Sequence, residues 1–509
     1  MQINDTDKHE RLQKVDGAYK GYLSAIKQLP YPGCFDFLHR EFVKLADSNF
    51  HIPSEAWKNP YELAHIANYV SLYGAHNALP IQFDLGVPLN QLKKLWALAE
   101  DENAYSPNDE YIASFVLRWI YQQLPYCIDP RRTTRTCELM RHLLTHPSVS
   151  AYVEASTSLT GERIMDMSFM LLRAFRRHSS YTEAQLRMLN KPHKDLAPAL
   201  ELLAADRDKR VKFQREKLEV KLVIEKPYEI STLLRYPIVK IDRDYYAPYP
   251  ELVGYGAARG LFFRFSEEGK NAFLDPFADA MEGYVANLMR RALPKAEVIT
   301  EADERAMGWQ KKTNDISVIF GNVALLFECK TSAFFVNAKR TAAPDIIIED
   351  VRKNLANSEK GKGLIQLYKK VDAIRSKALP ACLMEKYQDV QEIYPIVLLY
   401  DSTEHANAAA VVGNIIKDEL AANGMSGFDY QIWHLEELSW LVEFAGEELI
   451  RWTQRKFQPD CYPLGLNGFI SKTPGNFFLN QIMYMPNGNT KGLNILKALS
   501  EKQVDCKGP

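Results

Sequence analysis

Two acidic residues and a lysine lie close together in the sequence, in an order that could bind a divalent cation. Residues 314–330 read Asn-Asp-Ile-Ser-Val-Ile-Phe-Gly-Asn-Val-Ala-Leu-Leu-Phe-Glu-Cys-Lys. Gly321-Asn322 separates two runs of β-branched and apolar residues, which is the pattern of a tight β-hairpin. A two-residue turn pairs Phe320 with Val323 and sets the register of the whole hairpin.

That register places Asp315 directly opposite Glu328, with Cβ atoms roughly 4.5–5.5 Å apart. Lys330 follows Glu328 by two residues and therefore points to the same face. Two facing carboxylates repel each other unless a cation neutralises them. Mg²⁺ typically takes one or two carboxylates together with water and phosphate oxygens. The pattern predicts a Mg²⁺ (or Mn²⁺) centre that hydrolyses phosphodiesters, with Lys330 positioning water or stabilising negative charge.

The alternative is a solvent-exposed hairpin face with an ordinary Glu–Lys neighbour pair, because this spacing also arises by chance. However, residues 324–327 (Ala-Leu-Leu-Phe) are apolar on both faces, as in a buried central strand. Charged residues at the end of such a strand favour the catalytic interpretation.

The segment resembles the PD-(D/E)XK nuclease superfamily, with Asn314-Asp315 in place of Pro-Asp and Glu328-Cys329-Lys330 as the E-x-K. The resemblance covers about residues 270–440. It implies a restriction-endonuclease-like mixed sheet flanked by helices, in the order α-β-β-β-α-β. It also implies that the backbone carbonyl of Cys329 can serve as a metal ligand.

A glutamate on the helix before the hairpin often completes the metal site in this family. The apolar spacing predicts a helix over Asp275–Leu293, in which Glu282 shares a face with Val285 and Met289. An inward glutamate needs a partner. The metal is one such partner, and an ion pair with an arginine is the alternative.

The helix after the hairpin, expected over Gly363–Lys377, is similar to the glutamine-bearing helix of RecB-like members. Gln366 is then implied to assist catalysis by binding water or phosphate. The tyrosine expected four residues later is absent, because position 370 is lysine. The alternative for Gln366 is a solvated helix residue.

Four regions follow from the pattern along the chain. Residues 1–215 predict an all-α domain for sensing, regulation or nucleic-acid binding, and residues 216–269 predict a β-rich connecting segment. Residues 270–445 form the predicted nuclease domain, an α/β mixed-sheet core, and residues 446–509 a C-terminal extension. Within the connecting segment, strands are expected at Val220–Ile224, Pro237–Ile241 and Gly260–Phe265.

Composition narrows the class of protein further. Among 509 residues there are 63 Lys and Arg and 64 Asp and Glu, so the net charge of -1 excludes a wholesale polycation. The seven cysteines contain no CxxC pair, which argues against a zinc ribbon or a disulfide framework. The polar N-terminus and the absence of a long apolar run predict a cytoplasmic protein without a membrane span.

The predicted partner is nucleic acid, DNA more than RNA. Chains that join a helical region to a nuclease domain resemble bacterial antiphage defence effectors, so a protein trigger or regulator is a further expected partner, and a homo-oligomer stays open. Two alternatives remain. One is a HEPN-type ribonuclease, since Arg141–His146 and Arg173–His178 both have the R-x4-H form. The other is a catalytically inactive scaffold that binds nucleic acid or protein.

Overall fold

The computed structural model describes residues 5–31, 33–47, 60–75, 85–103, 130–189, 193–218, 230–331, 344–357, 362–400, 416–446 and 448–458. The chain divides into two compact units. The first unit comprises residues 1–270 and 335–346, and the second comprises residues 271–334 and 347–509.

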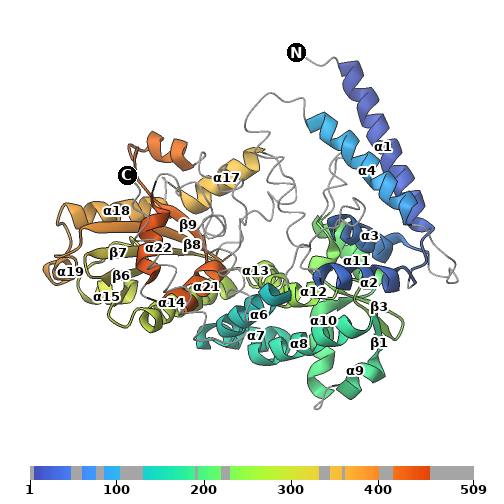
Figure 1. Ribbon diagram of the computed structural model, residues 1–509, viewed down its shortest axis with the longest axis horizontal. Coiled ribbons are helices and arrows are strands. Elements are labelled where there is room, and N and C mark those ends of the chain that lie inside the picture. Colours follow the sequence, from blue (N-terminus) through green and yellow to red (C-terminus); the bar gives the residue numbers. More distant parts are fainter. Residues whose placement is uncertain are drawn as a thin grey trace, which may run out of the picture. The chain divides into compact units, whose positions relative to one another are not determined.

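The first unit is mainly helical and carries a four-stranded sheet of short strands in the order β1-β4-β3-β2 (Figure 1). Its strands are β1 (Ser180–Thr182), β2 (Ala204–Ala205), β3 (Ile238–Ile241) and β4 (Asp244–Tyr246). Its helices are α1 (Asp5–Lys27), α2 (Gly33–Asp47), α3 (Pro60–Tyr73), α4 (Gly86–Asn103), α6 (Pro130–Leu144), α7 (Pro147–Thr157), α8 (Gly161–Arg177), α9 (Glu183–Leu189), α10 (Leu196–Leu203), α11 (Arg207–Phe213), α12 (Glu251–Tyr255) and α13 (Leu261–Gly269), with short helices η2 (His193–Asp195), η3 (Gln214–Leu218), η5 (Thr232–Leu234) and η6 (Gly256–Gly260).

The structure corrects two expectations in this unit. The region up to residue 215 is not all-α, because β1 and β2 join the small sheet; strands of two or three residues are too short to show an alternating pattern. The strand expected at Gly260–Phe265 is wrong, since this run begins helix α13. Leu261 and Phe265 are buried one helical turn apart, so tertiary packing overrides the β preference of the phenylalanines. The strand expected at Pro237–Ile241 is confirmed as β3, and Val220–Ile224 lies outside the described residues.

The second unit contains a five-stranded mixed sheet in the order β5-β6-β7-β8-β9. Its strands are β5 (Glu297–Thr300), β6 (Ile316–Phe320), β7 (Val323–Lys330), β8 (Glu392–Leu399) and β9 (Gln431–His434). Its helices are α14 (Asn271–Ala292), α15 (Glu301–Ala306), α17 (Pro344–Leu355, which begins in the first unit), α18 (Leu364–Arg375), α19 (Ala381–Lys386), α21 (Leu435–Ala445) and α22 (Glu448–Lys456).

Strands β5, β6 and β7 are antiparallel neighbours, whereas β8 and β9 continue the sheet parallel to β7. The hairpin register expected from Gly321-Asn322 is confirmed, because Phe320 pairs with Val323. Gly321 has φ +59°, a left-handed conformation that glycine adopts without strain. All of β7 except its last residue is buried, which matches an apolar strand at the centre of a sheet.

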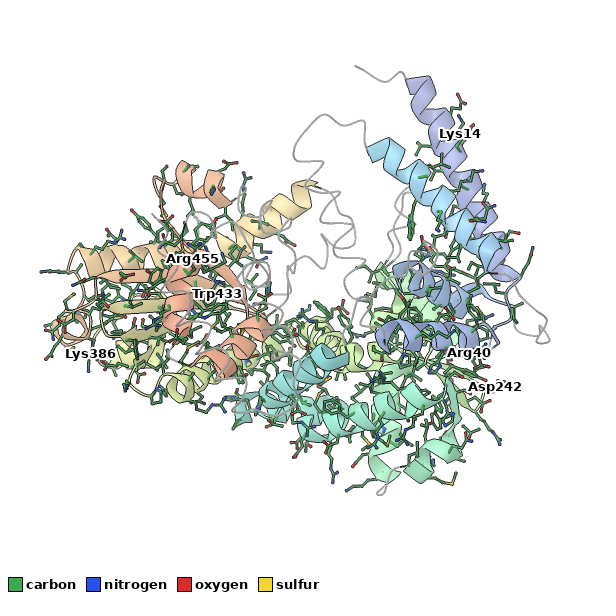
Figure 2. All side chains as sticks on the ribbon, viewed as in Figure 1. Lys14, Arg40, Asp242, Lys386, Trp433 and Arg455 are labelled. Carbon is green, nitrogen blue, oxygen red and sulfur yellow. The ribbon has the colours of Figure 1, made fainter. Side chains whose placement is uncertain are left out.

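Helices cover the second unit's sheet and complete its core. Helix α14 packs on β5, β6 and β7, while α18 packs on β7 and β8, and Figure 1 shows the strands between these two helices. Trp433 of β9 is fully buried, whereas Lys386 at the end of α19 lies at the periphery (Figure 2). Among the described helices of the whole chain, none is long and apolar enough to cross a membrane.

Candidate active site

The end of the β6–β7 hairpin brings Asp315 and Glu328 together. The ladder ends at the pair Ile316–Phe327, one pair before the expected facing pair of carboxylates. The Asp315 backbone N–H donates to the Phe327 carbonyl at 3.0 Å. Asp315 is therefore held beside the residue that precedes Glu328, just outside the regular ladder, and not as a strict cross-strand partner.

Each carboxylate has one well-defined hydrogen bond. The Cys329 backbone N–H donates to Asp315 Oδ2 at 2.6 Å, and Lys330 Nζ donates to Glu328 Oε1 at 2.5 Å. Asp315 is 2% exposed and Glu328 is fully buried, while the Lys330 side chain is 17% exposed. Within the described part of the chain, Glu328 Oε2 is buried without a hydrogen-bond partner. Such an oxygen is costly unless a cation or a polar ligand meets it.

The site holds more negative charge than its own lysine balances. Burial raises the pKa of Glu328 to about 8, and the neighbouring Asp315 charge adds to the effect. Burial likewise raises the pKa of Asp315. Burial alone would lower the pKa of Lys330, but the charges of Glu328 and Asp315 outweigh it, so the pKa of this lysine is raised. Carboxyls with raised pKa values next to a lysine are typical of functional sites.

Glu282 reaches the same site from helix α14. It is half-buried on the face that carries the buried Val285 and Met289, as expected from the helical spacing. Burial, followed by the charge of Asp315, raises the pKa of Glu282 to about 8. In the described residues Glu282 forms no ion pair with an arginine, so the alternative weighed from the sequence has no support.

Two further charged residues near the site did not emerge from sequence patterns. Lys312 lowers the pKa values of Glu282, Asp315 and Glu328 through its positive charge. Glu301, the first residue of α15, donates its backbone N–H to the Asp315 carbonyl at 2.9 Å, and its Oε2 lies 4.0 Å from Lys312 Nζ. The closeness of Lys312 to Asp315 in the sequence was the one available signal.

Cys329 and Gln366 differ in how they relate to the site. The Cys329 thiol is buried, and burial together with the nearby carboxylates raises its pKa well above the ordinary value. Its sulfur therefore stays protonated, and the backbone carbonyl remains the predicted metal ligand. Gln366 is buried, and its Oε1 accepts from the Gly363 backbone N–H at 2.9 Å. This glutamine is thus not a solvated residue: it caps the start of α18.

The chemistry of the donors suits a hard divalent cation, although the described side chains do not form a closed cage. Among the residues that the structure describes, no group of three or more His, Cys, Asp or Glu side chains is arranged to hold a metal ion. Carboxylate oxygens, with one buried oxygen of Glu328 lacking a partner, are nevertheless the ligands that Mg²⁺ uses. Asp315 and Glu328 would supply the first ligands, and water or phosphate oxygens the others.

The R-x4-H pairs take part in structural contacts where they are described. Arg141 Nη1 donates to Asp166 Oδ1 at 2.8 Å, and its Nε lies 3.3 Å from Glu138 Oε2. His146 precedes helix α7 as its N-cap, where its Nδ1 lies 2.6 Å from Ser148 Oγ. The first pair therefore contributes to helix packing and capping.

The second R-x4-H pair lies on the surface of α8, close to other basic residues. Arg173 and His178 are both exposed at the end of α8, and Arg176 Nε lies 3.3 Å from the buried Glu251 Oε1. Arg177 is exposed as well. Five further basic residues that cluster in the sequence and could contact phosphate have side chains outside the described ones: Arg131, Arg132, Arg135, Lys339 and Arg340.

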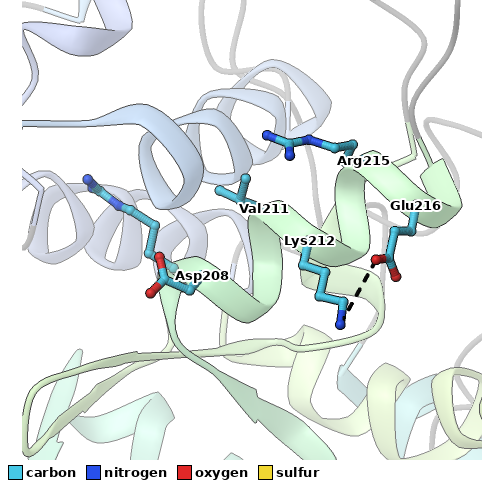
Figure 3. Close-up of a pocket in the computed structure, with 6 residues that line it drawn as sticks. Asp208, Val211, Lys212, Arg215 and Glu216 are labelled. Carbon is cyan, nitrogen blue, oxygen red and sulfur yellow. Dashed lines mark ion pairs between the residues drawn. The ribbon is translucent and has the colours of Figure 1, made fainter.

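A pocket of about 450 Å³ lies in the first unit, along α11 and η3 (Figure 3). Lys212 and Glu216 in its wall form an ion pair at 4.0 Å. Arg207 donates to the Gly74 carbonyl at 2.7 Å and lies over the Tyr31 ring. Two of its cations, Arg207 and Lys212, are thus already engaged, while Arg215 is exposed. The lining residues are Arg207, Asp208, Val211, Lys212, Arg215 and Glu216.

Comparisons with known proteins leave the site to be judged on its own geometry. No family model, no curated protein and no solved structure matches this chain.

Proposed function

We propose that this chain is a divalent-metal-dependent nuclease of the PD-(D/E)XK type, which hydrolyses phosphodiester bonds of DNA in preference to RNA. The observation that carries the proposal is the group of three carboxyls, Glu282, Asp315 and Glu328, whose pKa values are all raised beside the buried amine of Lys330. Such an excess of negative charge is stable near neutral pH only if protons or a cation bind.

The order of elements gives a second line of support. Helix α14 precedes the antiparallel strands β5, β6 and β7, then α18 precedes the parallel strand β8. The carboxyls come from the end of the hairpin and from α14, which is where the PD-(D/E)XK pattern requires them. By the same resemblance, the first unit would sense a trigger or restrain the nuclease in antiphage defence.

The residues of the site have separate tasks in this proposal. Asp315 and Glu328 would hold Mg²⁺, and Glu282, whose charge interacts with that of Asp315, would contribute through water. The chemistry that Mg²⁺ would supply when bound there is polarisation of the scissile phosphate and a lower pKa of the attacking water. Lys330, fixed by its hydrogen bond to Glu328, orients that water and stabilises the charge that develops on the phosphate oxygens.

Cleavage assays with matched variants test the proposal. Purified protein is incubated with Mg²⁺ or Mn²⁺ and with double-stranded DNA, single-stranded DNA or RNA. Lys330→Ala is compared with Lys369→Ala, which removes an exposed lysine of α18. We expect DNA cleavage by the wild type and by Lys369→Ala, and a loss of about 10²-fold or more in Lys330→Ala.

Three other results would contradict this proposal or its assignment of Lys330. Equal cleavage by all three proteins overturns the assignment of Lys330. Metal-independent RNA cleavage that is lost in Arg173→Ala supports the HEPN-type alternative. Binding of nucleic acid without cleavage at any metal concentration supports the inactive scaffold.

A further inference from the structure

A chain of buried side-chain hydrogen bonds runs behind Asp315. Trp309 Nε1 donates to Thr313 Oγ1 at 3.1 Å, and the Thr313 hydroxyl lies 3.5 Å from Asn314 Oδ1. Asn314 Nδ2 then donates to Ser317 Oγ at 2.9 Å. Every donor in this series points the same way along the chain, so each bond polarises the next.

The chain ends on a buried ion pair. Ser317 Oγ donates to Glu304 Oε1 at 3.2 Å, and Lys370 Nζ donates to the same oxygen at 2.6 Å. The Glu304 and Lys370 side chains are at most 1% exposed. Lys370 Nζ also lies 5.7 Å from the centroid of the Trp309 ring and 5.3 Å from that of Tyr387, within reach of cation–π attraction.

The two charges come from distant parts of the sequence. Glu304 lies in α15 and Lys370 in the second turn of α18. Burial raises the pKa of Glu304 and lowers that of Lys370, while the pairing opposes both shifts. Taking both charges out of water costs free energy, so the pair contributes little net stability. A role for the pair must therefore be sought in the side chains that it holds in place.

What it orders is the short segment that carries Asp315. Asn314 and Ser317, which flank Asp315, are both links of the buried chain. On its other side Asp315 is held by Phe327 and by the Cys329 N–H. The segment is therefore fastened from one side by strand β7 and from the other by the ion pair.

We propose that Glu304, held in place by Lys370, positions the Asp315 carboxylate through the acceptor oxygen that it presents to Ser317, which fixes Asn314 and Ser317 from behind. Lys370 and Glu304 are thus positioning residues that act through other side chains and touch no reacting atom. The consequence for metal affinity rests on the proposed function, whereas the placement of Asp315 does not.

A buried ion pair can be replaced by neutral groups with little loss of stability, so the acceptor for Ser317 can be kept or removed independently of the two charges. The double variant Glu304→Gln/Lys370→Met removes both charges but keeps an acceptor for Ser317. The double variant Glu304→Met/Lys370→Met removes the acceptor as well. Ser317→Ala interrupts the chain without altering the pair, and Lys369→Met serves as the surface control.

Hydrogen exchange at the Cys329 amide reports where the Asp315 carboxylate lies, because that N–H donates to Asp315 Oδ2. We expect about tenfold faster exchange in Glu304→Met/Lys370→Met and in Ser317→Ala, and wild-type exchange in Glu304→Gln/Lys370→Met and Lys369→Met. Mn²⁺ titration is expected to show about tenfold weaker binding in the first two proteins only.

The outcomes separate the two proposals. If Ser317→Ala keeps wild-type protection at Cys329, the positioning proposal is wrong. If Glu304→Met/Lys370→Met does not fold, Ser317→Ala against Glu304→Gln/Lys370→Met still decides it. If wild-type protein binds no Mn²⁺ while the exchange pattern is as expected, the positioning holds and the metal-dependent function fails.

Discussion

Two lysine–glutamate ion pairs with a buried glutamate lie in the five-stranded unit, and they differ in the charge around them. Lys330–Glu328 and Lys370–Glu304 have similar separations of 2.5 and 2.6 Å. In the described residues, both glutamates also keep one buried oxygen without a hydrogen-bond partner. Glu304 accepts from Lys370 and from the Ser317 hydroxyl, and Lys370 is its strongest charged neighbour. Glu328, in contrast, has a second buried carboxylate, that of Asp315, as its strongest charged neighbour.

The comparison shows which observation indicates function. A buried ion pair, or even an unpartnered oxygen within it, is shared by both places and distinguishes neither. Of these two described glutamates, Glu328 is the one whose strongest charged neighbour is another carboxylate, while Glu301 has only a smaller effect on Glu304. A divalent cation would correct the imbalance beside Glu328. At Glu304 the nearest charge is the opposite one of Lys370, and in our proposal this glutamate acts on the other site through the residues that flank Asp315.

The largest expected difference lies in stability. Lys370→Met leaves the Glu304 charge buried and alone, so we expect the free energy of unfolding to fall by about 3–5 kcal/mol. Lys330→Met should cost less, because Glu328, with its pKa of about 8, takes up a proton at neutral pH. Urea unfolding measures both, with Lys369→Met expected to stay within about 0.5 kcal/mol of wild type. Equal losses at the two lysines would break the comparison.

The next effect separates activity from stability. Asp315→Asn removes the charge that repels Glu328 while leaving the Lys330–Glu328 pair intact. We expect cleavage to fall by about 10²–10³-fold and the free energy of unfolding to rise by about 1 kcal/mol. Initial rates and thermal melts of the same preparation measure the two changes. A variant that lost both activity and stability would show that Asp315 is chiefly structural.

The carboxyls should also link metal binding to pH. Glu282 and Glu328 have pKa values of about 8 in the folded protein, so at pH 6 they hold protons that a cation must displace. We expect Mn²⁺ affinity to rise with pH, by up to about tenfold per unit for each proton displaced between pH 6 and 8, as measured by calorimetry. A flat or inverted profile would exclude these two carboxyls as metal ligands.

The same shifts predict the sign of the stability change in EDTA. The folded-state pKa values exceed the ordinary value of 4.5, so between about pH 4.5 and 8 the folded state binds more protons than the unfolded state. The free energy of unfolding therefore falls as pH rises through this range. Thermal melts at several pH values should show that Mg²⁺ removes much of the fall.

The smallest expected effect concerns Gln366. Gln366→Ala loses the acceptor that caps Gly363, so we expect a loss of about 1 kcal/mol in stability and only a small loss in cleavage. Gln366→Glu keeps the acceptor but removes the amide donor. If Gln366→Glu is stable yet cleaves more than tenfold more slowly, the assisting role expected from the sequence is supported.

Much of the hairpin could be predicted because its information is local. The turn at Gly321-Asn322 set the register, and the register brought Asp315 near Glu328. Helical spacing likewise pointed Glu282 inward from α14. The ladder ends one pair early, however, because the Asp315 N–H is bonded to Phe327 and its carbonyl to Glu301, and contacts with a neighbouring helix leave no trace in strand alternation.

The ion pair behind the site could not have been predicted in the same way. Lys370 stood out in the sequence only as a departure from an expected tyrosine. Its partner Glu304 lies 66 residues earlier, on a short helix that no periodic pattern predicts. Pairing between distant charges depends on how α15 and α18 pack, and only the folded chain brings them together.

Gly363 places a strong limit on which sequences this unit tolerates. It has φ +69°, and a Cβ atom there would lie 2.2 Å from the Leu355 carbonyl oxygen, so any side chain would force α18 away from the end of α17. Gln366 lies in the first turn of that helix and Lys370 in the second. A mutational scan of this region should therefore find the exposed position 369 permissive and position 363 closed to all nineteen replacements. Both the Gln366 cap and the Lys370–Glu304 pair thus depend on glycine at this one position.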